Sequence, residues 1–186
     1  EQFGEATPPQ HERSFFLPLS PYATSKIGAF YLCKNYRDSY NMFICNSIKF
    51  NFEGKFRGPE FVTRKITIAA AKIKNGLQEK LPMGNIEAFR DWGHCADYVE
   101  ADQKMLQRDF SDDYVIATGQ THSVREFLGE SFRNVGLEWR DYVTIDSKFQ
   151  RPSDLPILRG NYSKAQEKLG FTPKTLFKDL CKIMMD

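Results

Sequence analysis

The spacing of Tyr22 and Lys26 is the feature of this chain that points most directly to chemistry. Side chains four positions apart share one face of a helix, so the Lys26 ammonium would lie beside the Tyr22 phenol. A free tyrosine has a pKa of about 10 and seldom ionises near neutral pH. A neighbouring cation lowers that pKa toward the range in which a general acid or base works. The pair therefore predicts a proton shuttle, although the same spacing is also common on ordinary surface helices.

The elements around this pair predict a chain in which helices alternate with short strands. Ser20 and Pro21 suit the start of a helix that runs to about Tyr36. Strands are expected at 43–50, 81–83, 113–117 and 142–145, and further helices at 61–74, 94–107, 123–135, 163–169 and 176–185. Loops are expected at 51–58 and 90–93. This alternation indicates the α/β class.

The composition is that of a globular protein and argues against several kinds of partner. The 186 residues suffice for one sizeable domain or two small ones, and 41% of them are hydrophobic. With 26 basic and 24 acidic residues, the formal net charge of +2 gives no electrostatic basis for binding nucleic acid or an anionic membrane. No apolar run reaches the length of a membrane span, and no signal peptide opens the chain. We therefore expect a cytoplasmic protein that binds neither nucleic acid nor membrane.

The cysteines and histidines do not predict a metal site or a disulfide framework. The four cysteines show no Cys-x-x-Cys spacing, and the three histidines form no pair at the spacing of metal ligands. Scattered thiols of this kind are typical of a reducing compartment. We expect no bound metal ion.

A series of longer motifs accompanies the Tyr–Lys pair in a fixed order. They read Ser-Pro-Tyr-Ala-Thr-Ser-Lys at 20–26, Phe-Asn-Phe-Glu at 50–53, Phe-Val-Thr-Arg-Lys-Ile at 61–66, Arg-Asp-Trp-Gly-His at 90–94 and Arg-Pro at 151–152. Together they resemble the GDP-mannose 4,6-dehydratase family of the extended short-chain dehydrogenase/reductase superfamily. The resemblance covers nearly the whole chain, and the motifs at 61–66 and 90–94 separate this family from most other nucleotide-sugar epimerases and dehydratases. It implies a partial Rossmann-like fold with the small substrate-binding domain.

The resemblance also implies a domain division and a reaction. Residues 1–60 would form the later part of the Rossmann-like domain with the Tyr–Lys helix. Residues 61–186 would form mainly the substrate-binding domain, interleaved with the last Rossmann-like elements. In the reaction, NADP would oxidise C4 of GDP-mannose, water would leave across C5–C6, and hydride would return at C6 to give GDP-4-keto-6-deoxymannose. Family members assemble as dimers or tetramers, so a homo-oligomer is expected.

The catalytic and cofactor-binding residues are assigned by the same resemblance. Tyr22 would remove the proton of the C4 hydroxyl, and Lys26 would lower the pKa of Tyr22 and hold the nicotinamide ribose. Glu1 maps, across a one-residue gap, onto the glutamate that moves a proton between C5 and C6. Arg57 maps onto an arginine of the cofactor loop.

Five further residues map onto family positions that contact the sugar nucleotide. A GDP-sugar carries two negative phosphates, which guanidinium and ammonium groups bind well. Asn51, Lys65, Arg90 and Arg151 stand where the family contacts the nucleotide and the diphosphate, and Asp154 stands near its ribose-binding glutamate.

The chain departs from the family on the cofactor side. It contains no Gly-x-Gly-x-x-Gly or Gly-x-x-Gly-x-x-Gly motif, the glycine turn that cradles a dinucleotide pyrophosphate. Phe52 replaces a histidine that touches the cofactor, Phe56 replaces the first of a pair of arginines, and Asn161 replaces an aspartate. We therefore expect no turnover by this polypeptide alone.

Two other functions fit parts of the sequence. A non-catalytic remnant that binds GDP-sugars, or docks onto a complete homologue, would explain the missing glycine motif and Phe52. A related epimerase or reductase for another nucleotide sugar would keep the Tyr–Lys pair but has no reason for the motif at 61–66. Binding of GDP-mannose without binding of NADP would favour the remnant.

Overall fold

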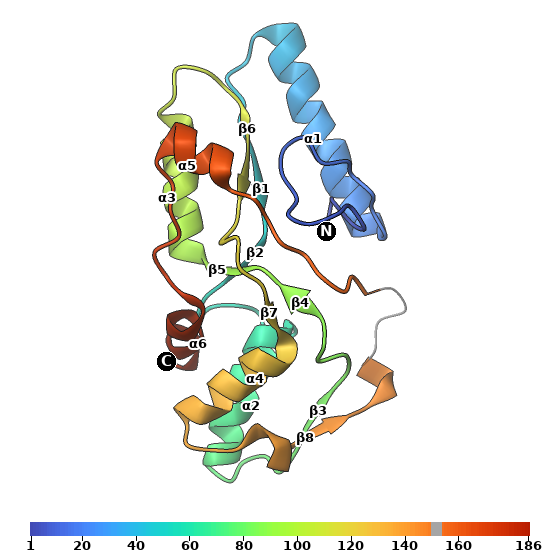
Figure 1. Ribbon diagram of the computed structural model, residues 1–186, viewed down its shortest axis with the longest axis vertical. Coiled ribbons are helices and arrows are strands. Elements are labelled where there is room, and N and C mark those ends of the chain that lie inside the picture. Colours follow the sequence, from blue (N-terminus) through green and yellow to red (C-terminus); the bar gives the residue numbers. More distant parts are fainter. Residues whose placement is uncertain (150–153) are drawn as a thin grey trace.

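The computed structural model describes residues 1–149 and 154–186, in which helices and short strands alternate (Figure 1). The α-helices are α1 (Pro21–Tyr40), α2 (Val62–Lys74), α3 (Cys95–Leu106), α4 (Val124–Asn134), α5 (Ser163–Leu169) and α6 (Phe177–Met185). The strands are β1 (Asn46–Lys49), β2 (Asn51–Glu53), β3 (Leu81–Met83), β4 (Phe89–Arg90), β5 (Trp92–His94), β6 (Asp113–Ile116), β7 (His122–Ser123) and β8 (Val143–Ile145). Two short 3₁₀ turns span Trp139–Asp141 and Ser147–Phe149. The expected α/β class is confirmed.

In the described part of the chain, the strands pair in four two-stranded ladders. β1 pairs with β6, β2 with β5 and β3 with β8, all in parallel, whereas β4 pairs with β7 in antiparallel fashion. In the first ladder Ile48 lies opposite Val115, and both side chains are buried. Parallel pairing requires long crossover connections, and the helices provide them.

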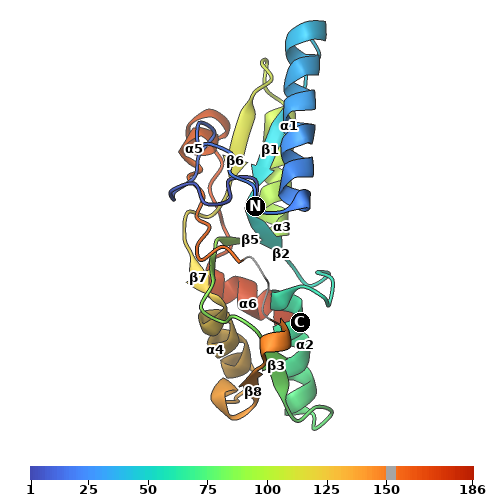
Figure 2. The same ribbon diagram turned by 90° about the vertical axis from the view of Figure 1, so that its right-hand side faces the viewer.

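The elements form two ends joined through β2 and β5. At one end, α1 lies on one side of β1 and β6, and α3 and α5 lie on the other side (Figures 1 and 2). At the opposite end, α2 and α4 lie next to β3 and β8. The N-terminal end of α1 points toward the middle of the molecule, where β2 and β5 meet (Figure 2).

Strong local signals set both ends of α1. The Ser20 side chain accepts a hydrogen bond of 3.1 Å from a backbone N–H of the first turn, and Pro21 is the first helical residue. Asn41 ends the helix in the left-handed conformation with φ of 52°. The helix therefore runs to Tyr40 rather than to Tyr36, because residues 37–40 include neither glycine nor proline.

The predicted ends of two later helices are confirmed. Ser123 Oγ accepts a hydrogen bond from the Glu126 backbone N–H at 3.1 Å, and Glu126 Oε2 accepts one from the Ser123 backbone N–H at 2.7 Å. This reciprocal capping box starts α4. Gly170 ends α5 with φ of 61°, a conformation in which a side chain would be strained.

The structure corrects the two expected loops. Residues 51–53 form β2, and residues 90 and 92–93 belong to β4 and β5. β2 pairs with β5, with Asn51 opposite Trp92. A strand of two or three residues is too short to show a hydrophobic periodicity in the sequence. Such a strand is recognised only from its pairing with a distant partner in the structure. The strand expected at 43–50 is also shorter and covers Asn46–Lys49.

Three buried apolar clusters hold these elements together. The first joins α2, α4 and α6 around Phe127. The second packs α3 and α5 against β6 around Ile116. The third joins the N-terminal segment to β1 and β6 around Val115, and all three of these side chains are fully buried. Burial of apolar surface in such clusters is the main stabilising contribution to a fold.

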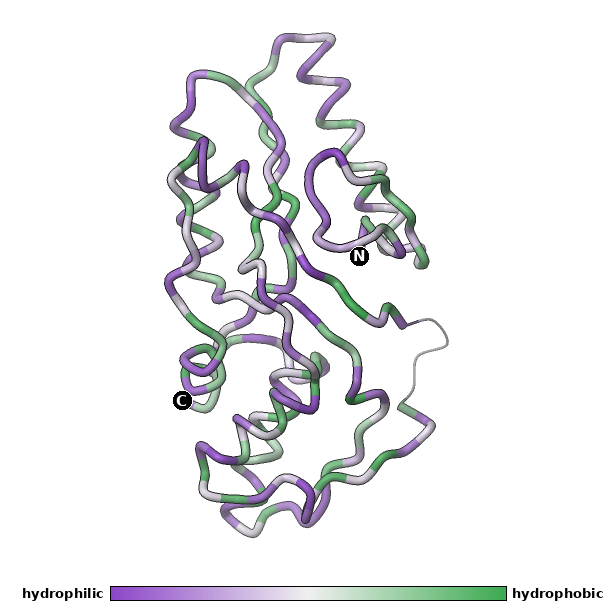
Figure 3. The backbone as a smooth tube through the Cα atoms, viewed as in Figure 1, coloured by the Kyte–Doolittle hydropathy of each residue, from purple (hydrophilic) through white to green (hydrophobic). Residues whose placement is uncertain are grey.

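Within residues 1–149 and 154–186, no helix is both long enough and apolar enough to span a bilayer. Figure 3 shows hydrophilic residues recurring along the helices between short hydrophobic stretches. In the same residues, histidine, cysteine, aspartate and glutamate side chains do not gather in groups of three or more that could hold a metal ion. The four cysteines are free thiols.

Candidate active site

Tyr22 and Lys26 lie on the first two turns of α1, as their spacing predicts. Lys26 Nζ is 5.4 Å from the centroid of the Tyr22 ring. Ser25 Oγ donates a hydrogen bond of 2.7 Å to the Tyr22 carbonyl oxygen, which ties this turn to itself. Tyr22 is 59% exposed, so its phenol is accessible to a ligand in the described structure.

The third apolar cluster anchors two other predicted site residues. Phe3, two positions after Glu1, stacks on Phe50, which directly precedes Asn51. Their ring centroids are 6.0 Å apart, and both rings belong to the cluster. The third apolar cluster therefore holds the backbone next to both Glu1 and Asn51, although these residues are far apart in the sequence.

The same cluster reaches α1 and the segment that carries Asp154. Phe16 of the N-terminal segment packs edge-on against Phe30 of α1, with ring centroids 5.1 Å apart. Leu155, which follows Asp154, also packs against the cluster. Packing around this cluster brings Phe3, the middle of the Tyr–Lys helix and the residue after Asp154 into one region.

Arg90 and Asp154 form an ion pair, although 64 positions separate them in the sequence. Arg90 Nη2 donates to Asp154 Oδ1 at 2.6 Å, and Nη1 donates to the carbonyl oxygens of Phe89 at 2.8 Å and Leu155 at 2.7 Å. The side chains of the pair are 15% and 20% exposed.

Lys65 extends from α2 to the backbone of β3. Its Nζ donates to the Pro82 carbonyl oxygen at 2.7 Å and lies 4.1 Å from the centroid of the Phe149 ring. Burial lowers the pKa of Lys65. Arg151, two positions after Phe149, lies outside the described residues. Lys65 is thus a partly shielded cation, and shielding strengthens its attraction for an anion.

Arg57 lies in the loop after β2 and is held by a buried carboxylate that the sequence did not reveal. Arg57 Nε is 3.1 Å from Glu53 Oε2, and Thr63 Oγ1 donates to the same oxygen at 2.7 Å. Burial raises the pKa of Glu53, while the Thr63 hydrogen bond and the Arg57 charge act in the opposite direction. The Arg57 guanidinium also lies 3.5 Å from the centroid of the Phe61 ring. These contacts fix Arg57 in one orientation.

Asp91, next to Arg90, is a second buried carboxylate that sequence reasoning missed. Its side chain is fully buried. Oδ1 accepts hydrogen bonds from Thr118 N at 2.8 Å and Thr118 Oγ1 at 2.6 Å, and Oδ2 accepts from Gly119 N at 2.9 Å and Gly160 N at 3.1 Å. Burial raises the pKa of Asp91, and these hydrogen bonds lower it. Asp91 thus ties the loop after β6 and the chain at Gly160 to the strand that carries Arg90.

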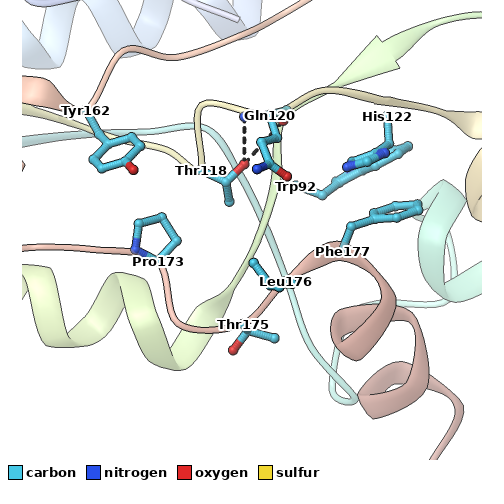
Figure 4. A pocket seen from close by; sticks show the side chains of 9 residues that line it. All are labelled: Trp92, Thr118, Gln120, His122, Tyr162, Pro173, Thr175, Leu176 and Phe177. Carbon is cyan, nitrogen blue, oxygen red and sulfur yellow. Dashed lines mark hydrogen bonds between the residues drawn. The ribbon is translucent and has the colours of Figure 1, made fainter.

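Two cavities lie near these residues. Figure 4 shows a cavity of about 110 Å³ that is lined by Trp92, Thr118, Gln120, His122, Tyr162, Pro173, Thr175, Leu176 and Phe177. The His122 and Phe177 rings stack there with centroids 3.7 Å apart. A larger, more open cavity of about 420 Å³ is lined by Gly84, Asn85, Ile86, Glu87, Arg125, Ile145 and Asp154. Among the described residues predicted for the site, Asp154 lines the second cavity and none lines the first.

Comparisons with known proteins identify the family of the chain. The family model for GDP-mannose 4,6 dehydratase matches residues 1–184. The chain belongs to the GDP-mannose 4,6-dehydratase family. Within this family, GDP-mannose 4,6 dehydratase 1 of Arabidopsis thaliana is 52% identical over 186 residues, which are 100% of this chain and 52% of the relative. GDP-mannose 4,6 dehydratase of Drosophila melanogaster is 45% identical over 194 aligned residues, covering 95% of this chain and 49% of the relative.

The chain therefore spans about half the length of the dehydratases that it matches. Among solved structures, RMD from Pseudomonas aeruginosa complexed with NADPH superimposes with a TM-score of 0.89 at 25% identity, covering 99% of this chain and 61% of that protein. This likeness confirms the expected partial Rossmann-like fold of the extended short-chain dehydrogenase/reductase type.

Proposed function

We propose that this chain is the catalytic-helix and substrate-binding part of a GDP-mannose 4,6-dehydratase, an NADP-dependent lyase that forms GDP-4-keto-6-deoxymannose. The ion pair of Arg90 with Asp154 carries the proposal. Motif position alone placed Arg90 where the family contacts the nucleotide and the diphosphate, and Asp154 near its ribose-binding glutamate. In the structure Arg90 Nη2 and Asp154 Oδ1 lie 2.6 Å apart. The family match over residues 1–184 supports the reaction.

Tyr22 and Lys26 are the proposed proton-transfer pair. Tyr22 takes the proton of the C4 hydroxyl as C4 is oxidised, and Lys26 Nζ lies 5.4 Å from the centroid of the Tyr22 ring. A nicotinamide cofactor bound beside Tyr22 and Lys26 would supply hydride transfer away from C4 and back to C6. Glu1 moves the proton between C5 and C6 as water leaves.

The residues present fit one part of a nicotinamide dinucleotide. Arg57 is held between Glu53 and the Phe61 ring, and a guanidinium fixed in this way suits a phosphate group. Tyr22 and Lys26 are exposed on α1, where they are accessible to a nicotinamide ribose. NADP is the proposed cofactor, and the NADPH complex of the similar RMD structure supports that choice.

GDP-mannose is the proposed substrate, held by Asn51, Lys65, Arg90, Asp154 and Arg151, the last of which lies outside the described residues. Two phosphates favour cations whose solvation is already reduced, as it is for Lys65 and Arg90. Because Arg90 and Asp154 hold each other before a ligand arrives, less conformational entropy is lost on binding.

We also propose self-association through α1 as a dimer or tetramer. Several large side chains of this helix are exposed: Tyr31 at 50%, Leu32 at 58%, Tyr36 at 51% and Tyr40 at 70%. Exposed aromatic and aliphatic side chains that adjoin one another are typical of interfaces. Sedimentation should show a mass above 21.6 kDa that Tyr36→Glu lowers, and a monomer at micromolar concentration would contradict this proposal.

Two further assignments belong to the same proposal. Residues 1–60 serve mainly the cofactor side and residues 61–186 mainly the substrate side. The separate apolar cluster of α2, α4 and α6 supports that division. The cytoplasm is the proposed location, in keeping with four free thiols.

A non-catalytic remnant that binds GDP-sugars is the second candidate. Phe52 and Phe56 are 41% and 90% exposed on the proposed cofactor side, where the family has a histidine and an arginine. An exposed phenyl ring cannot donate hydrogen bonds to a cofactor phosphate. These two side chains favour loss of cofactor binding with retention of sugar-nucleotide binding.

Calorimetry with GDP-mannose and, separately, with NADP tests the proposal. We expect GDP-mannose to bind, Arg90→Ala to weaken binding at least tenfold, and Asp109→Ala, an exposed control, to change nothing. Binding of both ligands supports the dehydratase, and binding of GDP-mannose alone supports the remnant. Tighter binding of UDP-sugars than of GDP-mannose would favour a related epimerase instead.

Activity provides a second test. No glycine-rich cofactor motif occurs in this sequence, so we expect no turnover by the chain alone. Formation of the GDP-ketosugar by the purified polypeptide would contradict this expectation. Absence of GDP-mannose binding would refute the proposed function itself.

A further inference from the structure

Among residues 1–149 and 154–186, two donors hold the carboxylate of Asp154, one on each oxygen. Arg90 Nη2 donates to Oδ1 at 2.6 Å, and Asn85 Nδ2 donates to Oδ2 at 2.9 Å. Donors on both oxygens fix the plane of the carboxylate as well as its position. An ionised carboxylate has about four acceptor sites, so about two remain for a ligand.

Asn85 is itself held in place on its other side. Its Oδ1 accepts a hydrogen bond of 2.9 Å from the backbone N–H of Glu87. The amide therefore has its oxygen turned toward the β3–β4 connection and its nitrogen turned toward Asp154. Because the amide is neutral, it orients the Asp154 carboxylate without neutralising the charge that a hydroxyl group would bind.

Both residues open onto the same space. Asn85 and Asp154 line the cavity of about 420 Å³, where Ile86 and Ile145 contribute apolar side chains and Glu87 and Arg125 contribute charged ones. Polar atoms that converge on a cavity with some apolar surface are typical of sites that orient a small ligand. A pair of neighbouring hydroxyl groups can approach the free acceptor sites of Asp154 from this cavity.

We propose that Asn85 is a positioning residue for Asp154, which it aims at the two ribose hydroxyls of a GDP-sugar. This inference rests on the proposed function, which assigns Asp154 to the ribose. Asn85 does not touch the ligand; it acts through the Asp154 carboxylate. Its contribution therefore depends on the presence of the ribose hydroxyls.

A purely structural role for Asn85 predicts a different outcome. The hydrogen bond from the Glu87 N–H to Asn85 Oδ1 shapes the turn and does not involve Asp154. Asn85→Asp retains an oxygen for that N–H, removes the Nδ2 donor and places a second negative charge beside Asp154. The variant therefore keeps the hydrogen bond that shapes the turn and loses the one to Asp154, so it distinguishes the two roles of Asn85.

The experiment compares GDP with 2′,3′-dideoxy-GDP, which lacks both ribose hydroxyls, by calorimetry on the full chain. For the original chain we expect GDP to bind more tightly than the dideoxy ligand. Asn85→Ala, Asn85→Asp and Asp154→Ala should each reduce that affinity ratio about tenfold. The ratio cancels any general effect of charge or folding, because both ligands carry the same diphosphate. Asn75→Ala is the matched control, since the Asn75 side chain bonds its own helix end at Ala71 O.

The double variant Asn85→Ala with Asp154→Ala provides the decisive comparison. If Asn85 acts through Asp154, the double variant should show no further loss beyond Asp154→Ala alone. An unchanged ratio in Asn85→Asp, or additive losses in the double variant, would overturn the inference and leave the proposed function intact. If the original chain does not bind GDP at all, the proposed function fails and the inference fails with it.

Discussion

Tyr22 and Lys26 stand on a helix with little buried surface, whereas Arg90 stands inside a network of buried hydrogen bonds. In the described part of the chain, Ala23 is the one buried residue among the 20 of α1. Asp91, next to Arg90, is fully buried and accepts four hydrogen bonds. Helix periodicity thus sets the geometry of the proton-transfer pair, and tertiary contacts set that of the substrate site. Substitutions on α1 should therefore change proton transfer and leave the free energy of unfolding almost unaltered. Substitutions in the network around Arg90 should change both stability and ligand binding.

Asp91→Ala should have the largest effect. It leaves the buried N–H group of Gly160 and the partly buried N–H groups of Thr118 and Gly119 without their acceptor, at about 1–3 kcal/mol for each that stays unsatisfied. We expect urea denaturation to show a loss of about 3 kcal/mol or more in the free energy of unfolding, because burial of the ionised Asp91 offsets part of the total. The exposed Asp109→Ala should stay within about 0.5 kcal/mol. A loss below about 1 kcal/mol for Asp91→Ala would contradict the contrast between the two regions.

Arg90→Lys should weaken GDP binding by about 10- to 30-fold. Lysine keeps the charge but cannot donate at once to Asp154 and to the carbonyl oxygens of Phe89 and Leu155, so it holds neither the ion pair nor the segment behind it. Calorimetry measures this loss, with the exposed Arg108→Lys as the matched control. Equal affinities of Arg90→Lys and the original chain would show that charge alone suffices there.

Lys65 should make the affinity for GDP decrease at alkaline pH. Burial lowers the pKa of Lys65 below its ordinary value of 10.5, so affinity should fall as pH rises through that lowered pKa. Lys65→Arg should remove this part of the fall, because a guanidinium stays protonated. For the ligand-free protein the sign is opposite: the folded chain binds fewer protons at Lys65 than the unfolded chain, so stability rises with pH between the lowered pKa and 10.5.

The test for Lys65 is calorimetry at several pH values on both proteins. We expect the affinities of the two to converge near neutral pH and to separate by a factor of a few at alkaline pH. Identical pH profiles would exclude Lys65 as the group that binds the diphosphate.

Tyr22→Phe should have the smallest effect on stability and binding. Because the hydroxyl lies on an exposed helix face, we expect a change within about 0.5 kcal/mol in the free energy of unfolding and less than twofold in GDP affinity. The proposed loss is confined to proton transfer. A clear loss of GDP affinity in Tyr22→Phe would mean that α1 is coupled to the Arg90 network more closely than its burial indicates.

The sequence predicted those parts of the fold that depend on neighbouring residues. The capping box of Ser123 with Glu126, and the end of α5 at Gly170, act within four positions and were recognisable without a structure. β2 and β5 could not be recognised in this way. Each is defined as a strand by its hydrogen bonds to the other, with Asn51 opposite Trp92. Very short strands with distant partners leave no local pattern.

The candidate site shows the same division. The side-by-side placement of Tyr22 and Lys26 followed from their spacing. Family resemblance assigned Arg90 and Asp154 to sugar-nucleotide contacts, but no pattern in the sequence predicted their ion pair across 64 positions. Asp91 was missed because its donors lie 27 to 69 positions away, and its place inside the specific motif at 90–94 was the one signal available.

The long-range pairing of the strands has a consequence for how quickly the fold can form. Asn46 of β1 pairs with Asp113, 67 residues later, and Leu81 of β3 pairs with Val143, 62 residues later. At a synthesis rate of about 5–20 residues per second, each of these strands waits several seconds for its partner to emerge from the ribosome. Helices complete themselves within microseconds, so α1 and α2 form long before any ladder does. The nascent chain therefore passes through a period in which helices are present and strand edges are open, and refolding dominated by such distant contacts is slow.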